Sequence, residues 1–445
     1  MEQQHLLTAT MLKLNEHMQK LIVLGLSISV ILLRGWGSVI LLRVRDVSFF
    51  LQPRFWAEEG SLFFANAYSY AQTQFWYKGL TFTRHGYFAL WPNLATTIAA
   101  NLVQLEFAPL VTTLFAFVVQ LIPISIILWS RSSFWSTRER KIFGILIVLF
   151  TPLNGETWLN TITSQFHFSL VAFLLILEQT NESRVRDWIN RILLVFAGLT
   201  GPVSCFLIPI FAFRVWSEKQ KERLVQLLIL TGCLIVQVTL MTTSKWSTVS
   251  DRVISFGFSD VVLILWTQSV GLVFTGLHSA RKFFGALDCI RQQDAVEIAV
   301  IPTLVAESGI FWLLSRRLSS SERLIFLGGY FLIIILSIIG SIGDKQALIN
   351  TGSGQRYFLI PNIILLFLVL ANIDFQKEKV SSGLYVILLA FSLYLGMRIY
   401  QETSFASRSW PVWKEQVHMW REHPEHELEI WPPPNWKVTL RKYEK

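Results

Sequence analysis

The stretch that decides the fold class runs from Leu324 to Ile342 and reads LIFLGGYFLIIILSIIGSI, without one charged side chain. A helix of about 20 apolar residues covers the roughly 30 Å of hydrocarbon in a bilayer. Comparable runs recur from Leu21 to Tyr400, about 11 or 12 apolar segments in all. Only 16% of the residues are charged, against about 25% in a soluble domain. The sequence therefore predicts an all-α polytopic membrane protein.

The remaining composition fits this class and excludes others. Seventeen Trp and 34 Phe suit aromatic belts at the membrane–water boundary. The net charge of +9 is explained by basic cytoplasmic loops and contact with anionic lipids. No basic soluble module is present to bind nucleic acid. Three separated cysteines, Cys205, Cys233 and Cys289, form no metal-binding or redox pattern and are expected to be small apolar residues.

Charge and hydropathy divide the chain into three parts. Residues 1–20 are polar and basic next to the first span, so we expect a cytoplasmic N-terminus and an uncleaved span. Residues 21–400 form the transmembrane domain, in which residues 44–87 are the first external loop, with short helices in the membrane interface. Residues 401–445 are rich in Trp and contain a run of three prolines. This tail is expected outside, packed on the membrane domain as a small cap.

One linker conflicts with this orientation. The segment Arg131–Lys141 is strongly basic and is expected in the cytoplasm. Two full crossings at Phe88–Leu105 and Pro109–Ser130 would return the chain to the outside instead. Either one of these two segments does not cross the membrane, or the charge rule fails here.

A helix break is expected in the apolar segment Ile192–Phe213. It contains Gly198-Leu199-Thr200-Gly201-Pro202, and a proline inside a helix removes one hydrogen-bond donor and clashes with the preceding turn. The break can serve a site, or it can be a kink against a neighbouring helix.

The first candidate for chemistry is Trp56-Ala57-Glu58-Glu59-Gly60 in the first external loop. Adjacent residues on a helix point about 100° apart, so the two carboxylates need not share one task. Either could act as a general base on a hydroxyl, or supply oxygen ligands to a divalent cation such as Mg²⁺ or Mn²⁺. The alternative is a solvated pair, or a pair neutralised by Arg54 or Arg84. We favour Glu59 as the catalytic carboxylate because it lies beside the flexible Gly60.

The second candidate is the polar stretch after Thr151-Pro152, which contains Asn154, Glu156, Asn160, Gln165 and His167. Irregular polar backbone beside membrane spans is tolerated where it lines a protein cavity. Glu156 and Asn160 are four residues apart and would share one face of a helix. Amides and a carboxylate suit recognition of sugar hydroxyls. The alternatives are a helix-capping turn and, for His167, an ordinary interfacial histidine.

The third candidate is Thr351-Gly352-Ser353-Gly354-Gln355-Arg356-Tyr357. Glycine and serine let backbone donors approach an anion, and an arginine can hold a phosphate with two parallel hydrogen bonds. Arg84, His85 and Lys345 are weaker candidates for the same task. The alternative is a flexible loop in which Arg356 and Tyr357 anchor the membrane interface.

Together these motifs resemble the GT-C superfamily of polytopic glycosyltransferases, which take sugars from polyprenyl-phosphate carriers. The likeness rests on Trp56-Ala57-Glu58-Glu59-Gly60 in the first external loop, on Asn154-Gly155-Glu156 through Gln165, and on Arg356-Tyr357 before a late span. Many members of that superfamily carry Asp in the first motif, so the pair Glu58-Glu59 leaves open which carboxylate acts and whether a metal is used.

The resemblance implies a GT-C-like fold and an inverting glycosyltransferase of a bacterial inner membrane, with its site on the extracytoplasmic face. It implies that Glu58 or Glu59 is the base, and that Arg356 holds the phosphate of a polyprenyl-phosphate-linked sugar. The acceptor would be a cell-envelope glycan or a lipid-linked oligosaccharide. Two alternatives remain open: a transporter or flippase of lipid-linked sugars, and an envelope-polymer ligase or polymerase.

Overall fold

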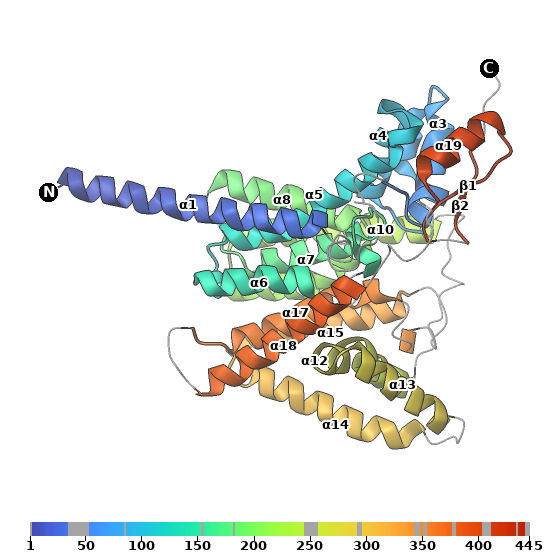
Figure 1. The fold of residues 1–445 in the computed structure, drawn as a ribbon. Coiled ribbons are helices and arrows are strands. Elements are labelled where there is room, and N and C mark those ends of the chain that lie inside the picture. The colour runs from blue at the N-terminus through green and yellow to red at the C-terminus, as the bar shows by residue number, and fades with distance from the viewer. Residues whose placement is uncertain are drawn as a thin grey trace.

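The computed structural model describes residues 2–33, 53–83, 86–152, 155–180, 183–243, 257–291, 296–341, 348–349, 354–375, 380–402, 411–432 and 435–440. About 80% of these residues lie in helices (Figure 1). Within the described part of the chain, strands are limited to β1 (Leu428–Glu429) and β2 (Lys437–Val438), which pair antiparallel. The fold is therefore helical, as the sequence predicts.

The first half of the chain forms one group of packed helices. Its members are α1 (Glu2–Leu33), α5 (Ala108–Trp129), α6 (Arg138–Phe150), α7 (Ser164–Leu177), α8 (Arg184–Leu199), α9 (Ile208–Glu218) and α10 (Lys221–Thr243). Short 3₁₀ turns join several of them: η5 (Ser133–Trp135), η6 (Gly155–Thr157) and η7 (Pro202–Leu207).

The second half adds a further group of helices below the first in Figure 1. It comprises α11 (Phe258–Leu265), the π-helical η9 (Trp266–Val270), α12 (Gly271–Thr275), α13 (Leu277–Arg291), α14 (Val296–Ser315), α15 (Ser320–Ile339), the 3₁₀ turn η10 (Gln355–Tyr357), α17 (Leu359–Ala371) and α18 (Val380–Glu402). Helices α6 and α17 pack against each other and join the two groups.

Burial separates central helices from outer ones. All but the last residue of α17 are buried, as expected for a helix that is apolar on every side. Helices α10 and α18 instead expose apolar side chains, with Ile235 at 63% and Leu384 at 67% exposure. Apolar side chains exposed on these outer helices suit contact with lipid tails, because lipid tails are as apolar as the side chains themselves.

Five described helices are long and apolar enough to cross a membrane: Leu105–Trp129, Lys221–Thr243, Phe258–Thr275, Ser320–Ile339 and Ser382–Ile399. A sixth candidate is the pair Arg184–Leu199 and Pro202–Glu218, bent by 116°. The expected break at Gly201-Pro202 is thus confirmed. These helices fit a multi-pass membrane protein. Several of the other apolar segments in the sequence are shorter helices in the described part of the chain, such as α7 and α17.

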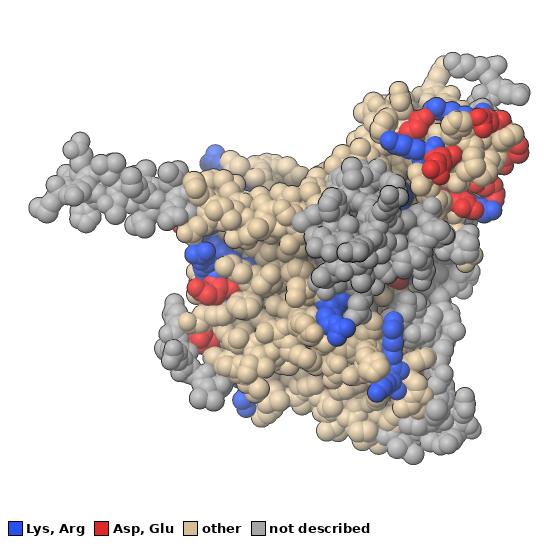
Figure 2. Space-filling view, viewed as in Figure 1, with Lys and Arg blue, Asp and Glu red and all other residues tan. Residues whose placement is uncertain are grey.

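A separate small unit, which we call the cap, lies at one end of the helices. It consists of residues 53–83, 86–107, 411–432 and 435–440. Its elements are the π-helical η1 (Glu59–Phe64), α3 (Ala65–Ala71), η2 (Trp76–Thr81), α4 (Leu90–Leu102), η4 (Leu105–Phe107), α19 (Trp413–Glu422), β1 and β2. In Figure 1 the cap stands at the upper right, opposite the N-terminus. Many of its charged side chains are visible in Figure 2.

The cap has an apolar cluster of its own, built from both ends of the chain. Phe55 and Phe64 stack with ring centroids 4.4 Å apart, and Trp413 meets Phe55 edge-on at 5.0 Å. Trp420, Leu428 and other buried residues complete this cluster. The C-terminal segment therefore packs on the first loop through a shared core, which fixes both parts in place.

Helix α4, the first of the two segments within residues 88–130, packs in the cap. It has 13 residues, about 20 Å at 1.5 Å per residue. The Asn93 amide ties it to the cap by donating to the carbonyls of Leu80 (3.1 Å) and Phe82 (2.8 Å). Only α5 then leads from the cap to residues 130–137, at the other end of the helices (Figure 1).

We call that other end the linker end, meaning residues 130–137, 178–180, 316–319 and 372–375. Hydrogen bonds tie these linkers to one another. Arg140 of α6 donates to the carbonyls of Phe134 (3.4 Å) and Ile373 (3.3 Å), and the Ser130 hydroxyl donates to the Glu178 carboxylate. Many of the basic side chains that interrupt the apolar runs lie at or beside this end, while the cap occupies the opposite end.

Several sequence predictions fall outside the described residues. These are residues 34–42 of the span 21–42, Arg84, His85, Asn154, Lys345 and Thr351 to Ser353. Cys205 and Cys233 are buried free thiols, and the side chain of Cys289 lies outside the described part.

Candidate functional site

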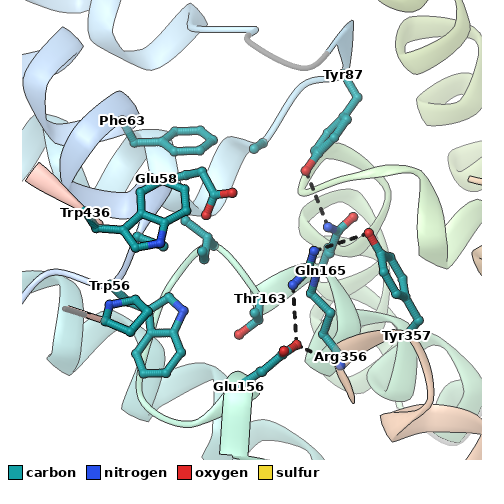
Figure 3. Close-up of a pocket in the computed structure, with 14 residues that line it drawn as sticks. Trp56, Glu58, Phe63, Tyr87, Glu156, Thr163, Gln165, Arg356, Tyr357 and Trp436 are labelled. Carbon is teal, nitrogen blue, oxygen red and sulfur yellow. Dashed lines mark hydrogen bonds and ion pairs between the residues drawn. The ribbon is translucent and has the colours of Figure 1, made fainter. Parts of the chain in front are cut away.

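A pocket lies between the cap and the ends of α7 and α17, with a volume of about 420 Å³. This volume is in the range of small-molecule sites. Fourteen residues line it: Trp56, Ala57, Glu58, Phe63, Tyr87, Ala89, Glu156, Ile162, Thr163, Gln165, Arg356, Tyr357, Pro432 and Trp436. All three motifs that the sequence singles out contribute to this one pocket (Figure 3).

The two adjacent carboxylates have separate environments. Glu58 lines the pocket, and within the described part of the chain no donor is hydrogen-bonded to its carboxylate. Glu59 is 1% exposed and does not line the pocket. The pocket-facing carboxylate is therefore Glu58, whereas the sequence led us to favour Glu59.

Glu59 instead fastens the first loop to the segment before α7. Its Oε1 accepts hydrogen bonds from the Thr161 backbone N–H (2.7 Å) and hydroxyl (2.5 Å), and its Oε2 accepts from the Trp56 N–H (3.1 Å). Burial raises the pKa of Glu59, and the bonds from Thr161 and Trp56 and the charge of Arg54 oppose that rise. This residue holds two parts of the site together.

An unusual backbone conformation directly precedes the two carboxylates. Ala57 has φ of +43°, a region that residues with a Cβ rarely adopt. Its N–H donates to the Trp431 carbonyl (2.5 Å), and its carbonyl accepts from the N–H of Gly60 and of Ser61. The chain then enters the π-helical η1 rather than a regular α-helix. Such irregular turns are frequent at functional sites.

Gly60 is a packing residue rather than a flexible one. A Cβ at this position would lie 2.7 Å from the Phe55 Cβ, 2.8 Å from the Ile430 Cδ1 and 3.1 Å from the Val438 Cγ2. Only glycine lets the C-terminal segment approach the first loop this closely. The Trp-Ala-Glu-Glu-Gly motif is thus also the docking point for the C-terminal segment.

On the other wall, Arg356 sits in the turn η10 directly before α17. Its backbone N–H and its Nη1 both donate to Glu156 Oε2 at 3.3 Å, and its Nη2 donates to the Tyr357 hydroxyl at 3.4 Å. Gly354 at φ of +69° starts this turn, where a Cβ would lie 2.8 Å from Leu348 Cδ2.

Arg356 stays charged at its position. Burial acts to lower the pKa of its guanidinium, but Tyr357, Glu156 and Glu58 outweigh burial and raise that pKa. Because the contacts to Glu156 and Tyr357 are long, the guanidinium keeps donors for a ligand anion, and its fork suits phosphate oxygens.

Gln165 and Tyr87 complete the polar wall. The Gln165 amide donates to the Tyr87 hydroxyl at 3.5 Å, and burial raises the pKa of Tyr87, so that its hydroxyl remains protonated. Gly201 (φ +135°), at the helix break, makes room for Gln165, because a Cβ there would lie 2.4 Å from the Gln165 Oε1. The break therefore packs against a residue that lines the pocket.

Two residues of the second motif lie behind the pocket. Asn160 is buried. Its amide donates to the Glu156 carbonyl (2.7 Å), and its Oδ1 accepts from the Thr163 hydroxyl (2.7 Å). The segment between η6 and α7 is an irregular turn, so Glu156 and Asn160 do not share a helix face. His167 is also buried, with Nε2 3.1 Å from the Thr157 carbonyl. Both residues shape the turn that presents Glu156 and Thr163.

The carboxylate pair does not fit a shared divalent cation. Both oxygens of Glu59 already accept hydrogen bonds, so it cannot join Glu58 as a ligand without breaking them. Across the part of the chain that the structure describes, no three His, Cys, Asp or Glu side chains are grouped so as to hold a metal ion.

Sequence reasoning did not assign Phe63, Tyr87, Pro432 or Trp436 to the site, although all four line the pocket. Trp436 and Pro432 come from the tail, and the sequence suggested only that the tail packs as a cap. The signal that could have found them is the concentration of tryptophans in the tail, but nothing local pairs Trp436 with Trp56.

Comparisons with known proteins do not identify a family for this chain. No protein-family model matches the chain, and a search of curated proteins finds no match.

Proposed function

We propose that this protein is an inverting glycosyltransferase that moves a sugar from a polyprenyl-phosphate carrier to a hydroxyl group of a cell-envelope glycan or lipid-linked acceptor. One observation carries the proposal. A carboxylate without a hydrogen-bond donor among the described residues, Glu58, and a charged guanidinium, Arg356, line one pocket at the end of an apolar helical bundle.

Each wall of the pocket suits one half of the reaction. The acceptor oxygen attacks the anomeric carbon of the donor, its proton passes to Glu58, and the bond from that carbon to the phosphate oxygen breaks. The electron pair leaves with polyprenyl phosphate, and Arg356 stabilises the added negative charge. Tyr87 and Gln165 supply hydrogen bonds to sugar hydroxyls. Because the acceptor oxygen displaces the phosphate in a single step, the anomeric configuration inverts.

The distribution of basic residues supports an extracytoplasmic site. Linkers rich in Lys and Arg stay in the cytoplasm, and Arg131, Arg138, Arg140 and Lys141 lie at or next to the linker end. The pocket is at the opposite end, beside the cap. In this orientation the N-terminus is cytoplasmic and the C-terminal segment is outside, in a bacterial inner membrane.

The test is transfer of radiolabelled sugar from a panel of undecaprenyl-phosphate hexoses and pentoses into native membranes that contain the protein. Removing a general base slows catalysis by about 10²- to 10⁴-fold, so we expect Glu58→Gln to lose transfer by that factor. Glu425→Gln is the control, because Glu425 is an exposed carboxylate of the cap that does not line the pocket, and this variant should retain full transfer. Full transfer by Glu58→Gln would refute this mechanism.

Transport of a lipid-linked sugar is the second candidate, and Glu307 favours it. This residue lies within the apolar helix α14, is 3% exposed, and its Oε1 has no hydrogen-bond partner among the described residues. Ionisable groups inside a membrane often mark transport pathways. Lipid-linked sugar that crosses proteoliposomes without any transferred product, and that stops crossing in Glu307→Gln, would establish this alternative.

A further inference from the structure

The pocket has two chemically different walls. In Figure 3, Arg356, Gln165 and Tyr357 lie on one side, while Trp56, Phe63 and Trp436 lie on the other with Glu58 among them. The first wall carries charge and hydrogen-bond donors. The second presents aromatic rings together with the carboxylate.

The aromatic wall is built from opposite ends of the chain. Trp56 and Phe63 come from the first loop, whereas Pro432 and Trp436 come from the C-terminal segment. Trp56 and Trp431 form a parallel β-bridge, in which the Trp431 N–H donates to the Phe55 carbonyl at 3.2 Å. The C-terminal segment is thus a structural part of the pocket.

Several contacts fix the rings of this wall in place. The guanidinium of Arg54 lies 5.9 Å from the Trp56 ring and 5.4 Å from the Trp431 ring, distances that allow cation–π attraction. The Phe63 ring meets the Phe82 ring edge-on at 5.4 Å, and a hydrogen bond from the Ile430 N–H to the Trp436 carbonyl (3.0 Å) fixes the backbone at Trp436. Aromatic side chains supported in this way lose little freedom when a ligand binds.

The apolar core of the cap accounts for these rings only in part, because Trp436 packs against that core on one side. Phe55, Phe64 and Trp413 fill that core and are buried. Trp56 and Trp436 are only partly buried and face the pocket. Partly exposed tryptophans in a concave site usually contact a ligand, since each offers a large flat apolar surface and one N–H donor.

We propose that Trp56, Phe63 and Trp436 form the subsite for the ring of an acceptor sugar, so that the C-terminal segment selects the acceptor. This inference rests on the proposed function. One face of a pyranose ring is made of C–H groups and packs on an aromatic ring, while its hydroxyls project from the edge. A ring stacked here presents a hydroxyl to Glu58, and the donor phosphate binds across the pocket at Arg356. The acceptor is therefore a glycan rather than a protein side chain or a lipid phosphate.

The experiment uses the full chain in detergent and measures two properties. The first is binding to an array of soluble oligosaccharides made of glucose, mannose, galactose or arabinose units. The second is the KM for the bound oligosaccharide and for the undecaprenyl-phosphate sugar during transfer. The variants are Trp436→Ala, Trp436→Phe and Trp56→Ala. Trp216→Ala is the control, because Trp216 is 74% exposed on α9 and does not line the pocket.

Loss of one stacking ring is expected to raise the acceptor KM about tenfold, with the donor KM changed less than twofold. Trp436→Phe should restore most of the affinity because it keeps a ring, and this rescue separates loss of stacking from loss of folding. A rise in donor KM instead, an unchanged acceptor KM, or no oligosaccharide bound by the wild type would each overturn the subsite.

The two proposals fail in different ways. If the wild type binds an oligosaccharide, Trp436→Ala does not, and no sugar is ever transferred, the subsite stands and the transferase proposal fails. If Glu58→Gln abolishes transfer while Trp436→Ala leaves the acceptor KM unchanged, the transferase stands and the subsite fails.

Discussion

Glu59 accepts hydrogen bonds from two N–H groups and one hydroxyl while it is almost fully excluded from solvent. Glu59→Gln keeps the volume of the side chain but turns an N–H group toward one set of these donors. A buried donor left unsatisfied costs about 1–3 kcal/mol, and more when a charged partner is lost. We expect destabilisation by about 3 kcal/mol, seen as a lower Tm in detergent. Glu58→Gln, which breaks no such bond, should leave Tm nearly unchanged.

The pH dependence of folding stability should also show that the pKa of Glu59 is raised in the folded protein. Burial raises its pKa in the folded protein, so the folded state keeps the proton to a higher pH than the unfolded chain does. The contribution of this carboxyl group to the free energy of unfolding is present below its pKa in the unfolded chain, about 4.3. It is lost as the pH rises through its pKa in the folded protein.

The measurement is the Tm of the wild type minus that of Glu59→Gln, followed from about pH 4 upward. Other titrating groups are common to both proteins and cancel in the difference. We expect the difference to decrease as the pH rises. A difference that stays constant or increases would show that Glu59 does not titrate in this way.

At the scale of elements, the close packing of the C-terminal segment against η1 requires one glycine, Gly60. Gly60→Ala places a Cβ within 2.7–3.1 Å of Phe55, Ile430 and Val438, and such overpacking costs about 1–3 kcal/mol. We expect a lower Tm and faster limited proteolysis after α19. The control is Gly232→Ala in α10, where a Cβ meets nothing within 4 Å. There the higher helix propensity of alanine should raise the free energy of unfolding by up to about 1 kcal/mol. Equal behaviour of the two variants would contradict this role for Gly60.

The same elements show what the sequence could and could not predict. The break at Gly201-Pro202 was predictable because proline cannot continue a helix, and so was the helical class, because long apolar runs need helices in a membrane. The sequence could not predict which of Glu58 and Glu59 faces the pocket, since this depends on φ at Ala57 and on a π-helical turn. The place of Trp436 depends on a contact between segments far apart in the sequence, which no local pattern encodes.

At the scale of the whole molecule, the helices place the cap and the linkers at opposite ends. Gln74→Cys in the cap and Ser136→Cys in a linker are both exposed positions with α5 between them. We expect an impermeant maleimide to label Gln74→Cys in spheroplasts, and Ser136→Cys only after the membrane is opened. Labelling of both from one side would mean that α4 also crosses the membrane.

The bridge between Trp56 and Trp431 has a consequence for synthesis. Because the ribosome makes the chain from residue 1 onward, Glu58 and Arg356 both exist before Trp436 is made. The helices can therefore insert while the pocket still lacks its last wall. A nascent chain that stops near residue 402 would hold both charged groups but would lack Pro432 and Trp436, so the pocket is complete only when the C-terminal segment docks.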